Sequence, residues 1–215
     1  MTRTVKRRAY DSSSRKEAAK ATRQSIFDAA RRLFLQNGYA GTTMPAIAQT
    51  AGVALDTVYA TAGKKPMLFR LLIETAISGR DKAVPAEERD YVHAIRAEPD
   101  AARKLQLYAA ALRTIQPRLA PLFQVLQAAA PLDPDLKALW QEISQRRAAN
   151  MRLLAKELAA TGRLRAGLSV PKVADIIWSM NSPEFYVLLV EQRGWSTEEF
   201  ECWLAQAWVR LLLNP

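Results

Sequence analysis

Two short helical patterns separated by a glycine turn occupy residues 41–65, and this segment limits the possible folds more than any other part of the chain. In the first pattern, Thr43 is a favourable N-cap, and Pro45 stands in the first turn, where a missing N–H is harmless. Gly52 then permits a sharp turn, because it has no Cβ to clash with the backbone. An apolar pattern resumes over residues 55–61. This spacing predicts a helix-turn-helix.

The second helix of such a motif lies in the major groove of DNA, so its side chains decide base readout. Residues 54–61 contain no Arg, Lys, Asn or Gln, the residue types that contact guanine and adenine best. We therefore expect weaker contacts, with Leu55 against thymine methyl groups, Asp56 accepting from cytosine N4, and Thr57 hydrogen bonding to base edges.

This segment and its flanking helices resemble the DNA-binding domain of the TetR family (TetR/AcrR-like) of bacterial transcriptional regulators. The resemblance rests on an amphipathic helix that runs into Asn37-Gly38-Tyr39, on the Thr-Thr start at residues 42–43, and on a tyrosine late in the second helix. It implies that Tyr59 and Lys65 contact DNA phosphate. A cation beside a helix that opens at Pro66 favours an anion site for an independent physical reason.

The chain departs from the family pattern at two positions near the end of the motif. Ala62 stands where the family usually has an aromatic residue, and Pro66 stands where an acidic residue is usual. We expect the junction between the third and fourth helices to differ accordingly. The predicted DNA-binding residues are Thr42, Thr43, Leu55, Asp56, Thr57, Tyr59, Lys64 and Lys65.

The net charge of +10 is concentrated in the first part of the chain. Residues 1–80 contain 14 Lys and Arg against 5 Asp and Glu, whereas residues 81–215 contain 17 against 16. This asymmetry is typical of a phosphate-binding module, and the helix-turn-helix favours double-stranded DNA over RNA or a membrane surface. Residues 1–16 form a basic arm that we expect to be flexible, and that either enters the minor groove or remains a solvated tail.

Catalytic and metal sites find little support in the composition. The single cysteine, Cys202, and the single histidine, His93, stand far apart, and no glycine-rich phosphate loop or carboxylate motif is present. We expect Cys202 to pack like a small apolar residue and His93 to lie on the surface or in a loop. The sequence therefore predicts no enzyme, no cofactor and no metal site. The absence of an N-terminal apolar run predicts a cytoplasmic protein.

The remaining sequence is helical by periodicity, so the predicted fold class is all-α. We expect a loop around residues 80–99, two short helices at 105–115 and 119–126 separated at Pro117, and a long helix over 134–161. Two final helices are expected at 170–192 and 196–213, the second with Ser196 as N-cap and Glu199 completing a capping box. The predicted organisation is a basic arm at 1–16, a helix-turn-helix domain at 17–65, a linking helix at 66–84, and a regulatory and dimerisation domain at 85–215.

The resemblance implies a homodimer held by the final two helices. A two-fold dimer reads two half-sites of a palindromic operator, spaced by about one helical turn, about 35 Å, or by a multiple of it. The expected interface residues are Ile177, Phe185, Leu188, Leu189, Trp203, Ala207 and Leu211. The alternative for part of this set is packing against the long helix of the same chain.

In the family, the middle helices enclose a cavity that binds a small molecule. The residues able to line it are Tyr108, Leu112, Phe123, Leu126, Gln127, Trp140, Ile143, Asn150, Met151, Trp178, Asn181 and Tyr186. The alternative for the aromatic members is ordinary core packing. Because no cluster of Arg or Glu is evident on these faces, we expect an apolar or weakly polar effector.

Three functions remain possible on the sequence alone. The first is a sequence-specific, homodimeric transcriptional regulator, a repressor that its ligand releases from DNA. The second is a non-specific architectural DNA-binding protein, which the basic arm and the weak reading helix favour. The third is a membrane-surface or protein-interaction module that uses the basic N-terminus.

Overall fold

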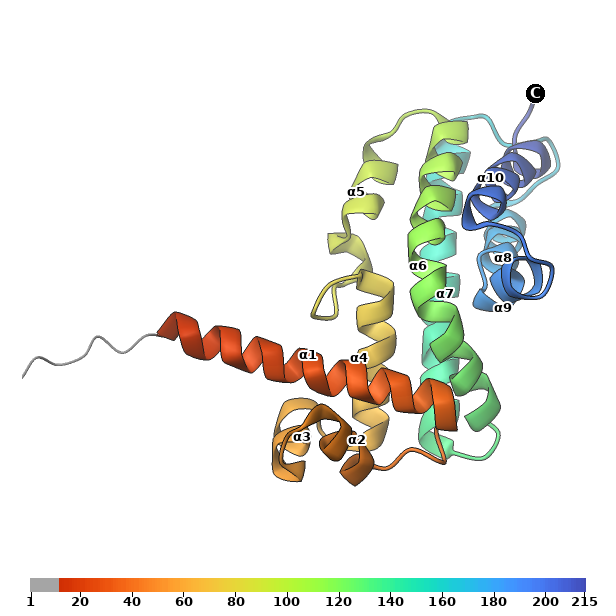
Figure 1. The fold of residues 1–215 in the computed structure, drawn as a ribbon. Helices are drawn as coiled ribbons and strands as arrows, with labels where there is room; N and C mark the ends of the chain where they lie inside the picture. Colours follow the sequence, from red (N-terminus) through yellow and green to blue (C-terminus); the bar gives the residue numbers. More distant parts are fainter. Residues whose placement is uncertain (1–11) are drawn as a thin grey trace, which may run out of the picture.

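The computed structural model describes residues 12–215, and these form helices joined by short connections (Figure 1). The elements are α1 Ser12–Asn37, α2 Met44–Ala51, α3 Leu55–Ala62, α4 Lys65–Ser78, the 3₁₀ helix η1 Ala86–Glu88, α5 Asp90–Ala97, α6 Ala101–Ala129, α7 Pro134–Ala160, α8 Val170–Met180, α9 Pro183–Tyr186, the π-helix η2 Val187–Glu191 and α10 Thr197–Leu212. The only β-type pairing within residues 12–215 is an isolated bridge between Leu164 and Leu213. The all-α prediction is confirmed.

Helices α1–α4 form a unit that we call the head. In Figure 1, α1 crosses α4, with α2 and α3 beneath it. Three aromatic rings form the centre of the head: Phe69 lies edge-on to both Phe34 and Tyr39, with ring centroids 4.9 and 5.4 Å apart. Ile47 of α2 and Val58 of α3 are fully buried in the same cluster, so the helix-turn-helix is held by apolar packing against α1 and α4.

Helices α5–α10 form the body, built on the long helices α6 and α7. Figure 1 shows α5 on one side of this pair and α8, α9 and α10 on the other. The apolar core of the head continues into the body through Leu119, Phe123 and Ile143, whereas a second core joins the remainder of α6 and α7 to α8 and α10. The head and the near end of the body therefore share one core.

Helix α6 runs without a break through Pro117 and Pro121, so the prediction of two short helices is wrong. A proline inside a helix removes one hydrogen bond. Pro117 is exposed, whereas Ile115 and Leu119 on either side of it are buried in the core shared by head and body. Packing of these flanking residues outweighs the local cost of the prolines.

Three other boundaries differ from the sequence expectations. The predicted loop at 80–99 contains α5, which is anchored by buried Ile95 and by Lys104 Nζ donating to the Ile95 carbonyl at 2.6 Å. The predicted helix over 170–192 is interrupted at Asn181, because Ser182 caps a new helix that begins at Pro183. Helix α1 begins at Ser12, inside the predicted arm, and residues 1–11 lie outside the described residues.

Other predicted features are present as expected. Helix α7 covers Pro134–Ala160, close to the predicted 134–161. The capping box of α10 is complete, with Glu199 N donating to Ser196 Oγ and Ser196 N donating to Glu199 Oε2. His93 is exposed, on α5 rather than in a loop.

The expectation that Cys202 packs like a small apolar residue is wrong, because Cys202 lies on an exposed position of α10.

Candidate DNA interface and adjoining cavity

The turn between α2 and α3 has the geometry that the sequence predicts. Thr43 caps α2 by accepting a hydrogen bond from Ala46 N at 3.3 Å. Gly52 has φ +69°, in the left-handed region that favours glycine. Ser25 Oγ of α1 donates to the Ala51 carbonyl at 2.9 Å and fixes the end of α2. These contacts set the angle at which α3 leaves the head.

The predicted DNA-binding residues differ in exposure. Thr43, Asp56, Tyr59 and Lys64 are exposed, and Leu55, Thr57 and Lys65 are half-buried. Thr42 is buried, with only 1% of its surface exposed, and its hydroxyl donates to the Gly38 carbonyl at 2.8 Å. The prediction that Thr42 contacts DNA is therefore wrong, because its side chain closes the turn after α1.

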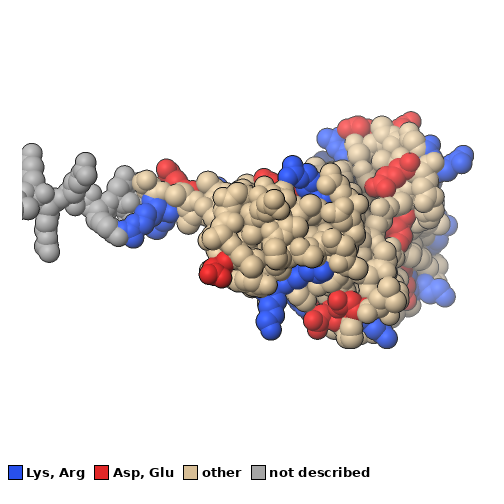
Figure 2. Space-filling model, turned by 60° about the horizontal axis from the view of Figure 1, so that its bottom comes forward, with Lys and Arg blue, Asp and Glu red and all other residues tan. Residues whose placement is uncertain are grey.

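Figure 2 shows the underside of the molecule, on which basic side chains stand apart from one another around a broad area without charge. The basic side chains gather most clearly where α1 emerges beside the undescribed N-terminal residues. Helix α3 contributes one acidic residue, Asp56, and no basic one. The charge that would attract DNA therefore comes from the margins of the head and not from α3 itself.

Lys65 at the start of α4 is bound to the turn after α1. Its Nζ donates to the Tyr39 carbonyl at 2.7 Å and to the Thr42 carbonyl at 2.9 Å, and it lies 4.1 Å from the centre of the Tyr39 ring. Burial lowers the pKa of Lys65, and Asp133 opposes that shift. An ammonium has three N–H groups. Lys65 thus has a positioning role in the head, and one N–H remains for the predicted phosphate contact.

Separate substitutions of Lys65 and of its neighbour Lys64 should distinguish the positioning role from the phosphate contact. Lys65→Met removes the two hydrogen bonds that Lys65 Nζ donates to carbonyls inside the head. We therefore expect a loss of about 1–3 kcal/mol in the free energy of unfolding. Lys64→Met should leave stability within about 0.5 kcal/mol and reduce the salt slope of DNA binding by about one unit. Urea unfolding and salt-dependent DNA titrations of both variants test this. Equal stability of the two variants would contradict the positioning role.

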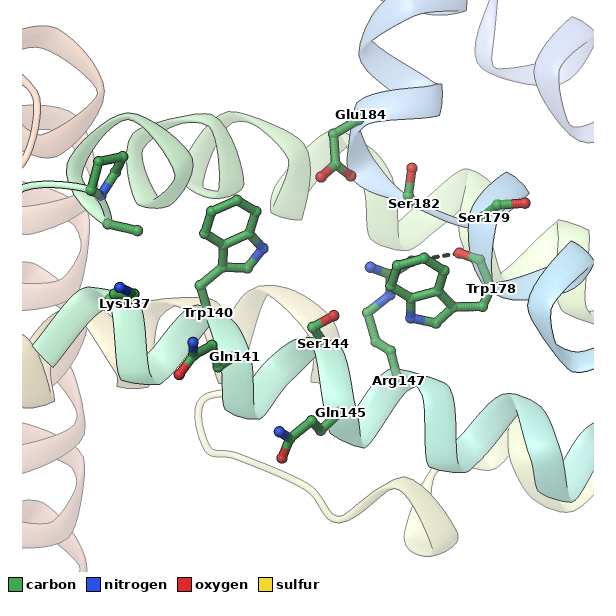
Figure 3. Close-up of a pocket in the computed structure, with 12 residues that line it drawn as sticks. Lys137, Trp140, Gln141, Ser144, Gln145, Arg147, Trp178, Ser179, Ser182 and Glu184 are labelled. Atoms are coloured by element: carbon green, nitrogen blue, oxygen red, sulfur yellow. Dashed lines mark hydrogen bonds between the residues drawn. The ribbon is translucent and has the colours of Figure 1, made fainter. Parts of the chain in front are cut away.

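A cavity of about 900 Å³ lies in the body, and we call it the Trp140–Glu184 cavity. It is lined by Ala130, Pro131, Lys137, Trp140, Gln141, Ser144, Gln145, Arg147, Trp178, Ser179, Ser182 and Glu184. Figure 3 shows that its side chains come from one face of α7 and from the segment where α8 gives way to α9. Its size is within the usual range for small-molecule sites, roughly 300–1,000 Å³.

Only some of the residues predicted to line an effector cavity lie at the Trp140–Glu184 cavity. Trp140 and Trp178 line the cavity, and Gln127 reaches its edge by donating to Glu184. Tyr108 and Asn150 line a separate, smaller cavity of about 90 Å³. The others are buried in the apolar or polar core of the chain, and they are Leu112, Phe123, Leu126, Ile143, Met151, Asn181 and Tyr186.

The sequence showed no cluster of Arg or Glu on these helix faces, whereas Lys137, Arg147 and Glu184 line the cavity. Lys137 and Arg147 share a helix face with Trp140, since their spacing follows the helical repeat along α7. That periodicity was a usable signal in the sequence. Glu184 was not detectable in this way, because the break at Asn181 sets the direction of the segment that carries it.

Arg147 connects the cavity to the end of α8. Its Nη2 donates to the Trp178 carbonyl at 2.9 Å and to Asn181 Oδ1, and its guanidinium lies 5.2 Å from the centre of the Trp178 ring. Burial lowers the pKa of Arg147, while Tyr108 and Glu184 act in the opposite direction. Asn181 Nδ2 in turn donates to the Tyr108 hydroxyl at 2.7 Å. The cavity wall is therefore bonded to the buried core.

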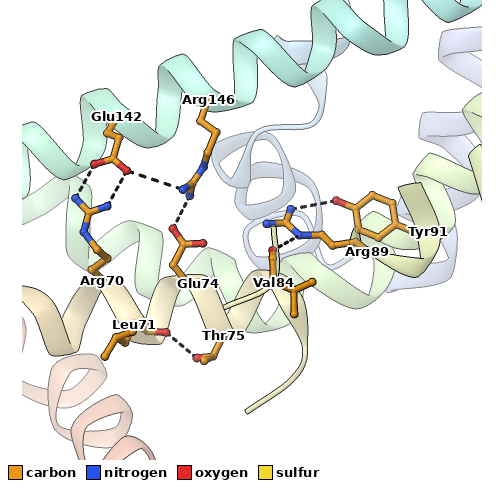
Figure 4. A network of polar contacts seen from close by, with 9 residues as sticks. All are labelled: Arg70, Leu71, Glu74, Thr75, Val84, Arg89, Tyr91, Glu142 and Arg146. Carbon is orange, nitrogen blue, oxygen red and sulfur yellow. Dashed lines mark hydrogen bonds and ion pairs between the residues drawn. The ribbon is translucent and has the colours of Figure 1, made fainter. Parts of the chain in front are cut away.

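The neighbouring turns of α7 that do not line the cavity bind the head. Arg70 of α4 forms two hydrogen bonds with Glu142, at 2.7 and 2.6 Å, and Glu74 of α4 accepts from Arg146 at 2.6 Å (Figure 4). The Arg70 guanidinium lowers the pKa of Glu142. We call these four residues the α4–α7 clasp. Because α7 carries both the clasp and the cavity lining, a displacement of α7 would be transmitted to α4.

The predicted interface residues are mostly accessible on the body. Leu188 and Leu211 are 51% and 49% exposed, and Phe185, Leu189, Trp203 and Ala207 are half-buried. Phe185 stacks on Trp203 with ring centroids 5.6 Å apart. Ile177 is fully buried inside the chain. Its prediction as an interface residue is wrong, because it faces the core of its own chain.

Residues 12–215 lack the features of a metal site and of a membrane span. No group of three or more His, Cys, Asp or Glu side chains there is arranged to hold a metal ion. None of the helices in this range is both long and apolar enough to cross a membrane.

Comparison with known proteins identifies the N-terminal part. Residues 26–72 match the family model described as bacterial regulatory proteins, tetR family. Over 75 residues the chain is 35% identical to the transcriptional regulator TtgR and to the probable regulator ArpR, both of Pseudomonas putida. These matches cover 35% of this chain and 36% of each relative, so the chain spans only about a third of their length.

Solved structures share the fold over nearly the whole chain. NalD of Pseudomonas aeruginosa, the secondary repressor of the MexAB-OprM multidrug efflux pump, superposes with a TM-score of 0.72 at 22% identity, covering 92% of this chain and 98% of NalD. The regulator FadR of Bacillus subtilis, solved with stearoyl-CoA, has a TM-score of 0.69 at 20% identity, with 87% and 98% covered. The matched relatives are regulators and not enzymes. Residues 26–72 are therefore similar to the DNA-binding domain of the tetR family of bacterial regulatory proteins, and the whole chain shares its fold with solved transcriptional regulators.

Proposed function

We propose that this protein is a homodimeric, sequence-specific transcriptional repressor that leaves its operator when a small molecule occupies the Trp140–Glu184 cavity. In this proposal residues 17–65 bind DNA, residues 66–84 link, and residues 85–215 sense the ligand and dimerise. The observation that carries it is the position of α7, which lines the cavity and also holds α4 through the clasp. The neighbours solved with choline and with stearoyl-CoA support a ligand role for the body.

The DNA contacts follow from exposure on the head. In this proposal Thr43, Tyr59, Lys64 and Lys65 contact phosphate, and Leu55, Asp56 and Thr57 contact base edges. The exposure of Thr43, Asp56, Tyr59 and Lys64 supports these contacts. A single head of this size buries little DNA surface, so specific binding requires two heads on a two-fold site. The exposed Leu188 and Leu211 favour pairing of the bodies.

A footprint on the DNA that flanks the protein's own gene tests this function. We expect a protected palindrome that survives excess random DNA at near-physiological salt. Diffuse protection that is lost to competitor would instead support the architectural alternative, which the absence of basic residues on α3 favours. Sedimentation of the protein with and without the protected DNA should report two chains for each operator.

Asp56→Asn provides a test of base readout. The exchange removes a charge that repels phosphate and adds a donor that pairs with adenine, so non-specific affinity should rise by about two- to tenfold. The ranking of operator variants should change at one base pair in each half-site. Selection of binding sequences from a random pool measures both effects, with Asp28→Asn on α1 as the control. An unchanged ranking would place Asp56 away from the bases.

A further inference from the structure

The Trp140–Glu184 cavity contains a buried carboxylate oxygen that has no hydrogen-bond donor within residues 12–215. Glu184 Oε1 accepts from Gln127 Nε2 at 2.7 Å, whereas Glu184 Oε2 is buried and unpaired. Figure 3 shows this carboxylate turned toward the space between Trp140 and Trp178. Buried acceptors without a partner are rare and unfavourable, and a charged one is the most unfavourable. The atom therefore indicates a donor that is absent from the protein itself.

The two cations of the cavity do not supply that donor. Arg147 is bound to the Trp178 carbonyl and to Asn181, and its charge lies against the C-terminal end of α8, where carbonyl dipoles favour a cation. Lys137 is exposed, so its charge is screened by solvent and salt. Within residues 12–215, neither forms an ion pair with Glu184 within 4.0 Å. Glu184 therefore remains the acceptor that a ligand can satisfy.

The two indole rings of the cavity are not equivalent. The Trp178 ring has the Arg147 guanidinium over it, so a second cation there would be repelled. Trp140 lies one helical turn from Lys137 and is half-buried on the wall of the cavity. Ala130 and Pro131, which line the same cavity, are apolar. This end of the cavity suits an aromatic or apolar body, and an ammonium group is attracted by an indole ring and by a carboxylate alike.

We propose that the effector is an amine, protonated at neutral pH, on an aromatic or apolar body. A rotation of the Glu184 carboxylate toward the cavity exposes Oε2, to which the ammonium donates, and the body of the effector packs against Trp140. Gln127 acts as a positioning residue, because it holds the other carboxylate oxygen. This inference rests on the proposed ligand-released function and replaces the uncharged effector expected from sequence.

Calorimetric titration of the full chain without DNA, using three probes with one ring system, tests the proposal. Naphthylethylamine should bind about tenfold more tightly than naphthylethanol, because only the amine offers a charge-assisted donor, and naphthylacetate should bind most weakly. Glu184→Gln keeps the side chain's shape but removes its charge, so the preference for amine over alcohol should fall below about threefold. Glu191→Gln is the matched control, since Glu191 accepts from Gln124 Nε2 outside the cavity.

The proposal is overturned if the alcohol or the acetate binds as tightly as the amine, if no probe binds, or if Glu184→Gln keeps the full preference. Loss of the preference in Glu191→Gln would also overturn it. Failure of the proposed function is distinguishable, because it appears in the footprint and not in the calorimeter. An operator complex that no amine dissociates would refute ligand release, even if amine binding at Glu184 were observed.

Discussion

Phe69→Ala is expected to abolish DNA binding by unfolding the head. The Phe69 ring is fully buried and contacts both Phe34 and Tyr39 edge-on, so its removal leaves a cavity at the centre of the three-ring cluster. Phe→Ala exchanges at such sites cost about 3–5 kcal/mol. Whole domains are usually stable by only about 5–15 kcal/mol. Urea unfolding followed by circular dichroism, together with a DNA titration, measures both consequences.

Met67→Ala is the matched control for this exchange, because Met67 lies on the same helix and is 51% exposed. It should change the free energy of unfolding by less than about 0.5 kcal/mol. The core of the head also continues into α6 and α7 through Phe123 and Ile143. We therefore expect Phe69→Ala to broaden the unfolding transition of the whole chain. If Phe69→Ala and Met67→Ala had the same free energy of unfolding, the aromatic cluster would not stabilise the head.

Arg146→Ala is expected to weaken the coupling between the cavity and the DNA-binding head. The exchange leaves the buried Glu74 carboxylate without its 2.6 Å partner, at a cost of about 1–3 kcal/mol, less than for a fully buried pair because Arg146 is partly exposed. The probe amine should still bind in the cavity, because Arg146 does not line it. The amount of amine needed to release DNA should rise by about tenfold, which fluorescence anisotropy of labelled DNA measures.

The clasp can be isolated by a double-mutant cycle with Glu74→Gln. If the Arg146–Glu74 ion pair couples the cavity to the head, the two substitutions together should lower the free energy of unfolding by about 1 kcal/mol less than the sum of the single substitutions. Arg152→Ala, an exposed residue further along α7, provides the control for helix α7 itself. Unchanged release in Arg146→Ala would show that coupling runs through another contact, such as the bond from Arg118 Nε to the Ala76 carbonyl.

Local patterns in the sequence predicted the features that the structure confirms. Thr43, Gly52 and the Ser196–Glu199 capping box act within a few residues of themselves, so their roles are visible in the sequence. Apolar periodicity located α7 for the same reason. Each of these predictions depends on local hydrogen bonding or on one helix face, and none requires knowledge of distant residues.

Long-range packing decided the features that sequence reasoning missed. Helix α6 continues past Pro117 only because its buried flanks pack against other helices. The side chains of Thr42 and Lys65 donate hydrogen bonds to carbonyls of the turn after α1. No local sequence pattern distinguishes a side chain that forms such a bond from one that does not. Ile177 has the same apolar character as Leu188, yet only the fold shows that Ile177 faces inward.

The sequence by itself determined the helical class, the helix-turn-helix and the basic N-terminal part, because these follow from residue type and periodicity. The tertiary structure alone decided where the cavity lies and that Glu184 faces Trp140 across it. Glu184 and Trp140 are 44 positions apart in the chain, and the break in the helix at Asn181 determines where Glu184 lies relative to Trp140. A cavity is the space left between packed helices, so its charge depends on distances that periodicity does not contain.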